Sequence, residues 1–474
     1  MNWVLLVLGG ILSASADVAA ALPASAAAPK LDGAKLGLFW ASPFVAILLS
    51  IAVLPLVAPN FWHQHFGKVS IACALAFLLP AAALHGVAVA AYELVHTMLL
   101  EYIPFIVLLL ALYTIAGGIR ITGSFVGTPA VNTALLAFGT VIASWMGTTG
   151  ACMLLIQPII RANLWRARKT HVFVFFIFLV GNIGGALTPL GDPPLFIGFL
   201  EGVDFFWTKR WMFLPMLVVA APLLIVFYLL DTYFHRQEGP APASITTGGE
   251  AFGIDGKLNL VLLAGVIGAV LLSGAWSSGV SFVIFHTVVS LEGVMRTIVL
   301  LGLTLVSMRF TRAETRTRND FTWFPIVEVA KLFLGIFITI IPVLAIVRAG
   351  EAGAAAELVG LLTSGGQPRE SMYFWITGFL SAFLDNAPTY LLLFNFAGGD
   401  AQTLMGPLMR TLLAISAGAV FFGAFSYIGN APNFMVKSIC ESRGIAMPSF
   451  FGFLGWSSLF LLPLFVLVNV LFFA

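Results

Sequence analysis

Two aspartates lie inside otherwise apolar segments of the sequence, each next to proline and amide side chains. Asp192 ends the string NIGGALTPLGD, which begins at Asn182, and Asp385 begins the string DNAPT. A carboxylate near the centre of a bilayer costs at least about 2.5–3.5 kcal/mol on insertion scales, so it usually marks an ion path or a proton relay. Carboxylate, amide, hydroxyl and backbone carbonyl oxygens together suit a hard cation such as Na⁺. Each aspartate could instead cap a half-helix, and capping and ion binding can coexist.

The candidate ion- or substrate-binding residues are the polar side chains of these strings and of two related polar strings. They are Asp192, Asp385, Asn182, Thr188, Asn386, Thr389, Ser144, Thr148, Thr149, Ser381 and Asn430, with the two aspartates as Na⁺ ligands. Glu101, Glu328 and Lys331 are candidate proton-coupling residues. Glu328 and Lys331 are spaced i,i+3, so a structural ion pair is the alternative for them.

The composition requires lipid as the solvent for most of the chain. Of 474 residues, 60% are hydrophobic and 9% are charged, whereas a soluble domain carries about 25% charged residues. The net charge of +2 is too small to suggest a nucleic-acid partner. No Walker A, HExxH or GxSxG motif occurs, and the three cysteines form no CxxC or Cys/His cluster, so we expect neither an enzyme nor a cofactor.

Short basic loops belong in the cytoplasm, and three polar segments fix the topology on that rule. They are the basic loop 161–169, the basic loop 309–320 and the segment 235–257, a Pro/Gly/Ser/Thr-rich linker. Both chain termini then lie in the periplasm of a multi-pass bacterial inner-membrane protein. Residues 1–35 contain a short apolar run and an A-x-A site, which indicates a signal peptide and a periplasmic segment; an uncleaved extra helix is the alternative.

The sequence predicts an all-α polytopic protein with about ten spanning helices and two re-entrant hairpins. The apolar stretch 121–160 has basic flanks that should share a side, so it must turn back, with its tip at residues 144–150. Residues 371–397 form the second hairpin, with its tip at 381–389. Re-entrant backbone is tolerated where it is buried or lines a watery cavity.

The same order of features occurs twice, which predicts two inverted repeats at 36–234 and 258–474. In each half an acidic residue, Glu101 or Glu328, opens a helix after the first apolar stretches, one of which covers residues 69–92. A polar hairpin tip follows, and then a helix interrupted by Gly, Pro and polar residues. Such paired interrupted helices are the best sequence indication of a transporter binding site near the bilayer midplane.

These motifs resemble those of a known family. The N-x-G-G-A-x-T-P-x-G-D pattern of Asn182–Asp192 and the string Asp385-Asn386-Ala-Pro388 are similar to signatures of NhaD-type sodium/proton antiporters. That group belongs to the ion transporter superfamily, which includes citrate carriers, and relatives with this pattern are often labelled as citrate transporters. The resemblance covers residues 36–474 and implies a homodimer. Carboxylate carriers of the superfamily show Ser-Asn-Thr triplets at both tips, whereas the tip Ser144–Thr149 lacks asparagine.

Exchange of Na⁺ or Li⁺ for H⁺ at the two aspartates is the leading functional hypothesis. A citrate or other carboxylate symporter is the alternative, although Lys331 is the only evident cation within the apolar segments to bind an anion. An intramembrane aspartyl protease is disfavoured because its GxGD motif is absent around Asp192. A passive channel is disfavoured because two oppositely directed broken helices suit alternating access.

Overall fold

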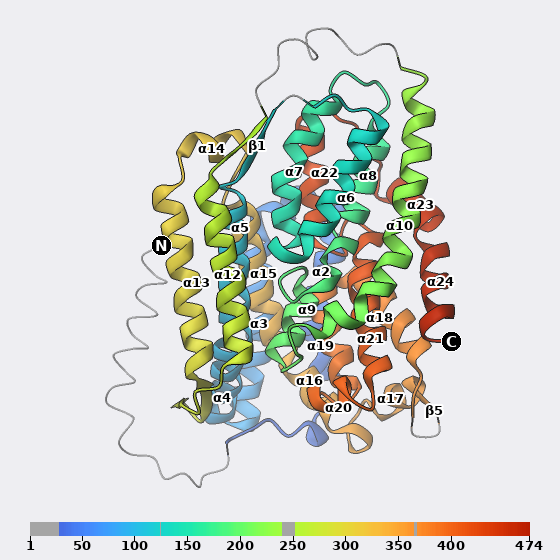
Figure 1. Cartoon of the computed structure of the whole chain (residues 1–474). Coiled ribbons are helices and arrows are strands. Elements are labelled where there is room, and N and C mark those ends of the chain that lie inside the picture. Colours follow the sequence, from blue (N-terminus) through green and yellow to red (C-terminus); the bar gives the residue numbers. More distant parts are fainter. Residues whose placement is uncertain (1–27, 124, 239–251, 365–366) are drawn as a thin grey trace.

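The chain is a bundle of apolar helices, as the sequence predicts (Figure 1). The computed structural model describes residues 28–123, 125–238, 252–364 and 367–474. Within these residues, nine helices are long and apolar enough to cross a membrane, or ten if the bent pair Phe450–Phe460 and Leu462–Phe472 is one span. The predicted all-α polytopic class is therefore confirmed. Most of the predicted signal peptide and linker, residues 1–27 and 239–251, lies outside the described residues.

The two halves contain the same succession of long helices, a helical hairpin and a broken helix. The first half comprises α2 (Ser42–Val57), α3 (Pro59–His85), α4 (Val87–Thr97), a π-helix η3 (Met98–Tyr102), α5 (Ile103–Ala116), α6 (Pro129–Met146), α7 (Thr148–Asn163), α8 (Thr170–Leu179), η4 (Ile183–Leu187), α9 (Pro193–Leu200) and α10 (Trp207–His235). The second comprises α12 (Lys257–Ala275), α13 (Leu291–Phe310), α14 (Ala313–Arg318), α15 (Phe324–Thr339), α16 (Ile341–Arg348), α17 (Ala356–Leu362), α18 (Glu370–Leu384), α19 (Asn386–Phe396), α20 (Ala401–Met405), α21 (Met409–Phe422), η6 (Gly423–Phe425), α22 (Ala431–Ser442), α23 (Phe450–Phe460) and α24 (Leu462–Phe472).

Short antiparallel strand pairs close the loops at the ends of the bundle. Strands β1 (Arg120–Thr122) and β2 (Gly253–Asp255) pair across the two halves, and Arg120 lies opposite Asp255. The other pairs are β3 (Ser281–Ile284) with β4 (Thr287–Ser290), and β5 (Thr363–Ser364) with β6 (Gln367–Pro368). We call the end of the bundle with β1 and α14 the basic end, because the basic loops 161–169 and 309–320 lie there (Figure 1).

The first spans differ from the sequence prediction in where they break. The predicted apolar stretch 69–92 is divided at Gly86, whose φ of +98° ends α3. Glu101 does not open a helix but lies inside the continuous span Val87–Ala116, within the π-helix. Hydropathy is insensitive to such a break because both sides of it are apolar.

Each predicted hairpin is present and turns at a single residue with positive φ. Gly147 joins α6 to α7 with φ +81° and ψ +147°, and Asp385 joins α18 to α19 with φ +82° and ψ +140°. The two residues therefore occupy equivalent positions in the two halves. Figure 1 shows α6 and α7 towards the basic end and α18 and α19 towards the opposite end. This placement supports the predicted opposite orientation of the halves.

Each predicted broken helix is also present, and glycine pairs allow its close turn. In the first break a Cβ on Gly191 would lie 2.1 Å from the carbonyl oxygen of Gly185. In the second, a Cβ on Gly429 would lie 2.8 Å from that of Gly423. The segment after each break begins a new helix, so that Asp192 is the N-cap of α9 and Asn430 is the N-cap of α22.

The helix that leads into the first break lies in the centre of the protein. Every residue of α8 from Val172 to Leu179 is fully buried. A helix that is hydrophobic on all sides packs inside a larger protein rather than at its surface. The break that carries Asp192 therefore begins inside the core of the bundle.

Candidate functional site

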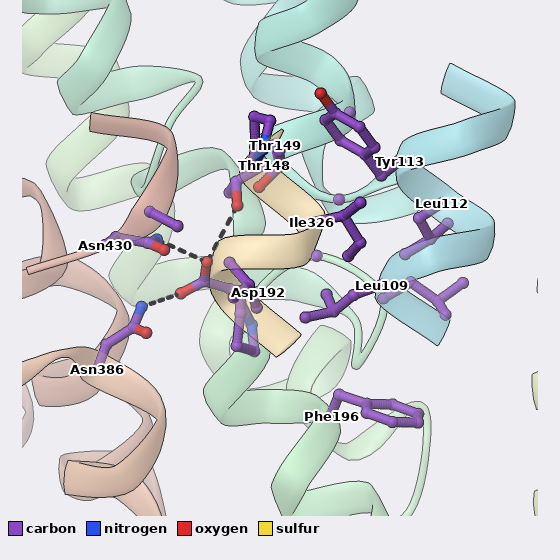
Figure 2. A pocket seen from close by; sticks show the side chains of 18 of the residues that line it. Leu109, Leu112, Tyr113, Thr148, Thr149, Asp192, Phe196, Ile326, Asn386 and Asn430 are labelled. Atoms are coloured by element: carbon purple, nitrogen blue, oxygen red, sulfur yellow. Dashed lines mark hydrogen bonds between the residues drawn. The ribbon is translucent and has the colours of Figure 1, made fainter. Parts of the chain in front are cut away.

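The carboxylate of Asp192 accepts hydrogen bonds from three segments that are distant in sequence (Figure 2). Its Oδ1 accepts from Thr148 Oγ1 at 3.1 Å and from Asn430 Nδ2 at 2.8 Å, and its Oδ2 accepts from Asn386 Nδ2 at 2.6 Å. Asp192 is 2% exposed. A carboxyl group that accepts three hydrogen bonds and donates none has the geometry of an ionised carboxylate.

Four half-helices begin at this carboxylate. They are α7 at Thr148, α9 at Pro193, α19 at Asn386 and α22 at Ala431. Each helix N-terminus carries partial positive charge, which stabilises an anion there. The geometry therefore explains how a buried carboxylate exists without a neighbouring cationic side chain.

The residues around Asp192 are equivalent pairs from the two halves. Thr148 and Asn386 each follow the turn residue of a hairpin, and Asp192 and Asn430 each cap the helix after a break. The backbone N–H of Thr148 also donates to the carbonyl of Gly191 at 2.8 Å, which joins the first tip to the first break. Both halves thus meet at one site, which the sequence could not show.

One buried oxygen next to Asp192 is not used. Asn386 is 1% exposed, and its Oδ1 has no hydrogen-bond partner among the described residues. A buried carbonyl oxygen without a partner is costly. It is a ready acceptor for a proton on Asp192 or a ligand for a cation.

A cavity of about 70 Å³ borders the site. It is lined by Asp192, Asp385, Asn386 and Asn430, and otherwise mainly by apolar side chains such as Leu109 and Phe196 (Figure 2). None of the described residues that line it is a lysine, arginine or histidine. Pockets for drug-sized ligands hold roughly 300–1,000 Å³, so this one fits an ion with a few waters.

Asp385 lines the same cavity but has a different environment from Asp192. Its Oδ1 accepts from the backbone N–H of Ala387 at 3.1 Å, so it caps the half-helix α19. Its backbone φ of +82° is a conformation that residues other than glycine rarely adopt. Asp385 therefore caps a half-helix, as the alternative from the sequence predicts, and it also lines the cavity.

The other predicted site residues do not bond Asp192, and two of them, Ser144 and Thr188, join the first hairpin tip to the first break. Ser144 Oγ donates to Gly184 O at 2.5 Å, and Thr188 Oγ1 donates to Ser144 O. Ser381 Oγ donates to Ala419 O at 2.6 Å in the second half. Thr389 Oγ1 donates to Asp385 O in its own helix at 2.8 Å, and Thr149 lines the cavity.

Asn182 forms a second layer behind Asp192 together with a residue that the sequence analysis missed. Asn182 Oδ1 accepts from Asn430 Nδ2 at 3.1 Å, and Asn182 Nδ2 donates to Asn433 Oδ1 at 2.7 Å. Asn433 in turn donates to the carbonyls of Gly423 and Ser426, both at 2.7 Å. The polar string after Ser426 contains Asn433, which was the available signal.

The predicted proton-coupling residues lie away from Asp192. Glu101 is in the π-helix, and its Oε2 is buried without a partner among the described residues. Glu328 lies in the second turn of α15. The described part of the chain contains no ion pair between Glu328 and Lys331; Lys331 is exposed and lies over the ring of Phe66.

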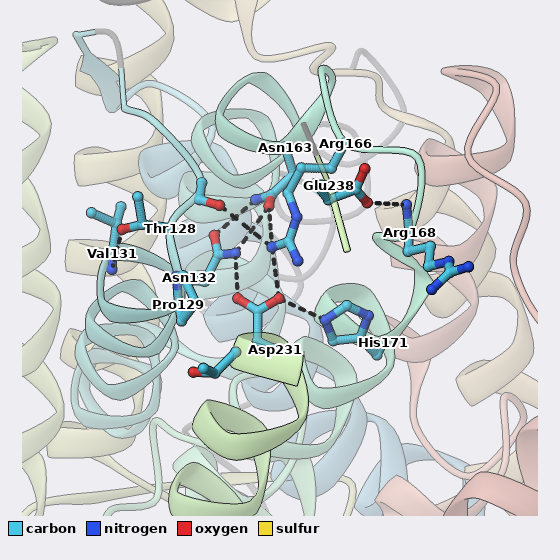
Figure 3. Close-up of polar contacts among 12 residues, drawn as sticks. Thr128, Pro129, Val131, Asn132, Asn163, Arg166, Arg168, His171, Asp231 and Glu238 are labelled. Atoms are coloured by element: carbon cyan, nitrogen blue, oxygen red, sulfur yellow. Dashed lines mark hydrogen bonds and ion pairs between the residues drawn. The ribbon is translucent and has the colours of Figure 1, made fainter. Parts of the chain in front are cut away.

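Two buried charges were not predicted. Arg296 on α13 is 9% exposed and stacks on Phe196 and Phe199, so Lys331 is not the only cation within the apolar segments. Arg166, in the predicted basic loop 161–169, is fully buried and pairs with Asp231 at 2.6 Å. His171 and Asn132 also bind that carboxylate, at 2.7 and 2.9 Å (Figure 3).

Comparison with known proteins places the chain in a transporter family. A family model described as "Putative citrate transport" matches residues 33–473. The comparison with curated proteins gave no match.

Proposed function

Because the chain belongs to this citrate-transport family, it is a multi-pass transporter, and we propose that it exchanges Na⁺ or Li⁺ for H⁺ at Asp192. The observation that carries the proposal is the buried carboxylate of Asp192 beside a small cavity whose described lining contains no cationic side chain. The expected setting is the bacterial inner membrane, with the basic end in the cytoplasm and two copies in the assembly. Both termini would then lie on the periplasmic side.

The amides around Asp192 suit each step of such an exchange. An ionised carboxylate accepts from the amide N–H groups of Asn386 and Asn430, as in the structure. A protonated carboxyl group donates instead, and Asn386 Oδ1 is a nearby acceptor without a partner among the described residues. Na⁺ needs oxygen ligands, which both amides present once they turn.

Competition for one carboxylate couples the two ions. A proton on Asp192 removes the charge that holds Na⁺, and Na⁺ at the same oxygens makes protonation unfavourable. Asp385 faces the same cavity and supplies a second negative charge there. Binding one ion therefore expels the other, which is the thermodynamic requirement for antiport.

The test uses everted membrane vesicles loaded with a pH-sensitive dye and energised to an acidic interior. Adding Na⁺ or Li⁺ should dissipate the acidification in vesicles with the protein, and K⁺ should not. Asp192→Asn should reduce the response to the level of vesicles without the protein. A full response from both Asp192→Asn and Asp385→Asn would contradict the proposal.

Carboxylate transport is a second candidate because the matching family is described by citrate. The four half-helix N-termini at the site also favour an anion. Against it, Asp192 already occupies that position, and a cavity of about 70 Å³ is small for citrate. Uptake of labelled citrate that depends on a Na⁺ or H⁺ gradient, with no Na⁺-dependent proton exchange in its absence, would favour this candidate.

A further inference from the structure

A small apolar cluster separates the cavity from the basic end. Its buried members are Tyr113 on α5, Met153 on α7 and Ile326 on α15, and it is distinct from the main core. Tyr113 and Ile326 also line the cavity. Figure 2 shows Tyr113 on the far side of the cavity from Phe196. The cluster therefore forms the cavity wall that faces the basic end.

A polar contact lies one helical turn beyond this cluster. Asp320 Oδ2 accepts from Gln157 Nε2 on α7 at 2.8 Å and pairs with Arg443 at the end of α22. Gln157 follows Met153 by four residues, and Arg443 follows Ile439, a peripheral member of the cluster, by four. The same two helices thus provide both the apolar and the polar layer.

The segment Asn319–Thr322 is itself fixed to α5 and its C-terminal turn. Asn319 Nδ2 donates to the carbonyls of Gly117 and Ile119, at 3.0 and 2.7 Å, and Tyr113 Oη donates to Thr322 O at 2.7 Å. Phe321 between them packs on the ring of Tyr113. Asp320 has a φ of +52°, a left-handed conformation that aspartate tolerates, and this turn directs its carboxylate to α7 and α22.

We propose that Asn319–Thr322 is a latch that closes the cavity at its predicted cytoplasmic end and releases in every transport cycle. The proposal rests on Asp192 being the transport site. The latch holds α7 and α22, and these two helices begin at Thr148 and Ala431, next to the carboxylate. The latch contacts lie farther along the same two helices, at Gln157 of α7 and at Arg443 after the last turn of α22, so a movement of these helices links the latch to the ion at Asp192. The Asp320 and Arg443 side chains are 40% and 45% exposed, and a contact of this weak kind suits one that opens repeatedly.

Two native cysteines report on opening. Cys152 precedes Met153 and Cys440 follows Ile439, and both are fully buried. With Cys73 replaced by serine, everted vesicles are treated with a membrane-impermeant maleimide, which meets the predicted cytoplasmic face. In Asp320→Asn and in Arg443→Gln, the maleimide should label these cysteines roughly threefold to tenfold faster than in the parent. That increase is expected for the loss of one partly exposed polar contact.

The matched control is Asp32→Asn, which removes the exposed ion pair between Lys35 and Asp32. That pair spans three residues at 3.1 Å and joins no second element, so labelling should stay at the parent rate. Unchanged labelling in both latch variants would overturn the proposal, and so would equal acceleration by the control. Labelling of the cysteines does not require ion transport. A failure of the Na⁺/H⁺ proposal would therefore appear in the dye assay and not in the labelling rates.

A cross-link between the two latch residues tests the proposal in a second way, because it holds the latch closed instead of removing one of its contacts. In a chain whose native cysteines are replaced by alanine, Asp320→Cys and Arg443→Cys are joined by a short cleavable bismaleimide. Ion exchange should fall at least about tenfold and return on cleavage, as expected if the cycle needs the latch to open. A monofunctional maleimide should not inhibit to the same extent. Exchange at the full rate with the cross-link in place would overturn the proposal.

Discussion

In the described part of the chain, neutral dipoles compensate the carboxylate of Asp192. Two of its donors are amides and one is a hydroxyl, and each comes from a different helical segment. The sequence predicted Thr148 and Asn386 as site residues from their place at the hairpin tips, and Asp192 and Asn430 from their place in the interrupted helices. It could not predict that they touch, because contacts between residues about 40 to 240 positions apart depend on how the halves pack.

Asn386→Ala should weaken the apparent affinity for Na⁺ by about tenfold, because a buried hydrogen bond to a charged group and a cation ligand are both lost. Thr389→Val on the same helix should change it much less, because that hydroxyl bonds only Asp385 O in the structure. The measurement is the Na⁺ concentration that gives half of the maximal dye response. Equal shifts for the two variants would argue against the arrangement seen here.

Asp385 should tolerate glycine better than alanine. Its φ of +82° costs a side chain about 1–3 kcal/mol and costs glycine little. Glycine also loses only a few tenths of a kcal/mol as an N-cap, whereas alanine loses about 1 kcal/mol. Thermal unfolding of the purified protein in detergent should therefore rank Asp385→Gly as the most stable, Asp385→Asn next and Asp385→Ala last. All three should lose ion exchange if the carboxylate takes part, so stability and activity separate.

At the scale of elements, the hairpins and breaks were predictable because their residues conflict with a straight helix in lipid. Gly, Pro and polar residues cluster at 144–150, 182–194, 381–389 and 426–433, and the structure turns or unwinds at each. The division at Gly86 was not predicted, since a single glycine between apolar runs does not alter hydropathy. The π-helix around Glu101 was also missed, because its sequence MLLEY contains no glycine or proline that would mark a change of helix type.

The glycine pairs of the breaks give a prediction at this scale. Gly191→Ala would place a methyl group 2.1 Å from a backbone oxygen, so the first break cannot keep its shape and ion exchange should be lost. Gly429→Ala, at 2.8 Å, should have a smaller effect of the same kind. Gly268→Ala in α12 is the control because nothing lies within 4 Å of its added Cβ. Equal exchange rates in vesicles for Gly191→Ala and Gly268→Ala would contradict this account.

At the scale of the whole molecule, a buried polar cluster joins four helical segments at the basic end. Asp231 of α10 binds Arg166 after α7, His171 of α8 and Asn132 of α6, and Asn132 also bonds Asn163 of α7 at 2.9 Å (Figure 3). These segments include both arms of the first hairpin and the helix that leads to Asp192. The sequence showed Arg166 only as one charge of the basic loop 161–169, because a partner 65 positions away is not visible from sequence.

Asp231→Asn should destabilise the protein by about 3–5 kcal/mol, because it leaves the buried guanidinium of Arg166 without a counter-charge. Arg166→Met combined with Asp231→Leu should recover part of that loss, since no charge then remains to be desolvated. Glu314→Gln, which removes the exposed pair with Arg318, should cost less than about 1 kcal/mol. Unfolding by denaturant in detergent measures all three, and a double variant worse than Asp231→Asn would count against the explanation.

The equivalent positions of the two hairpin tips carry different residues, and this has a kinetic consequence. Gly147 turns the hairpin at the basic end and Asp385 turns the one at the opposite end. An exchanger with chemically identical halves would exchange ions at the same rate in both directions under equal and opposite gradients. In the proposed exchange, a cation that approaches along the first hairpin meets a neutral turn, and one that approaches along the second meets a carboxylate. The ion gradients alone set the equilibrium, so this difference acts only on rates. We expect the exchange rates in the two directions to differ when equal and opposite gradients are applied.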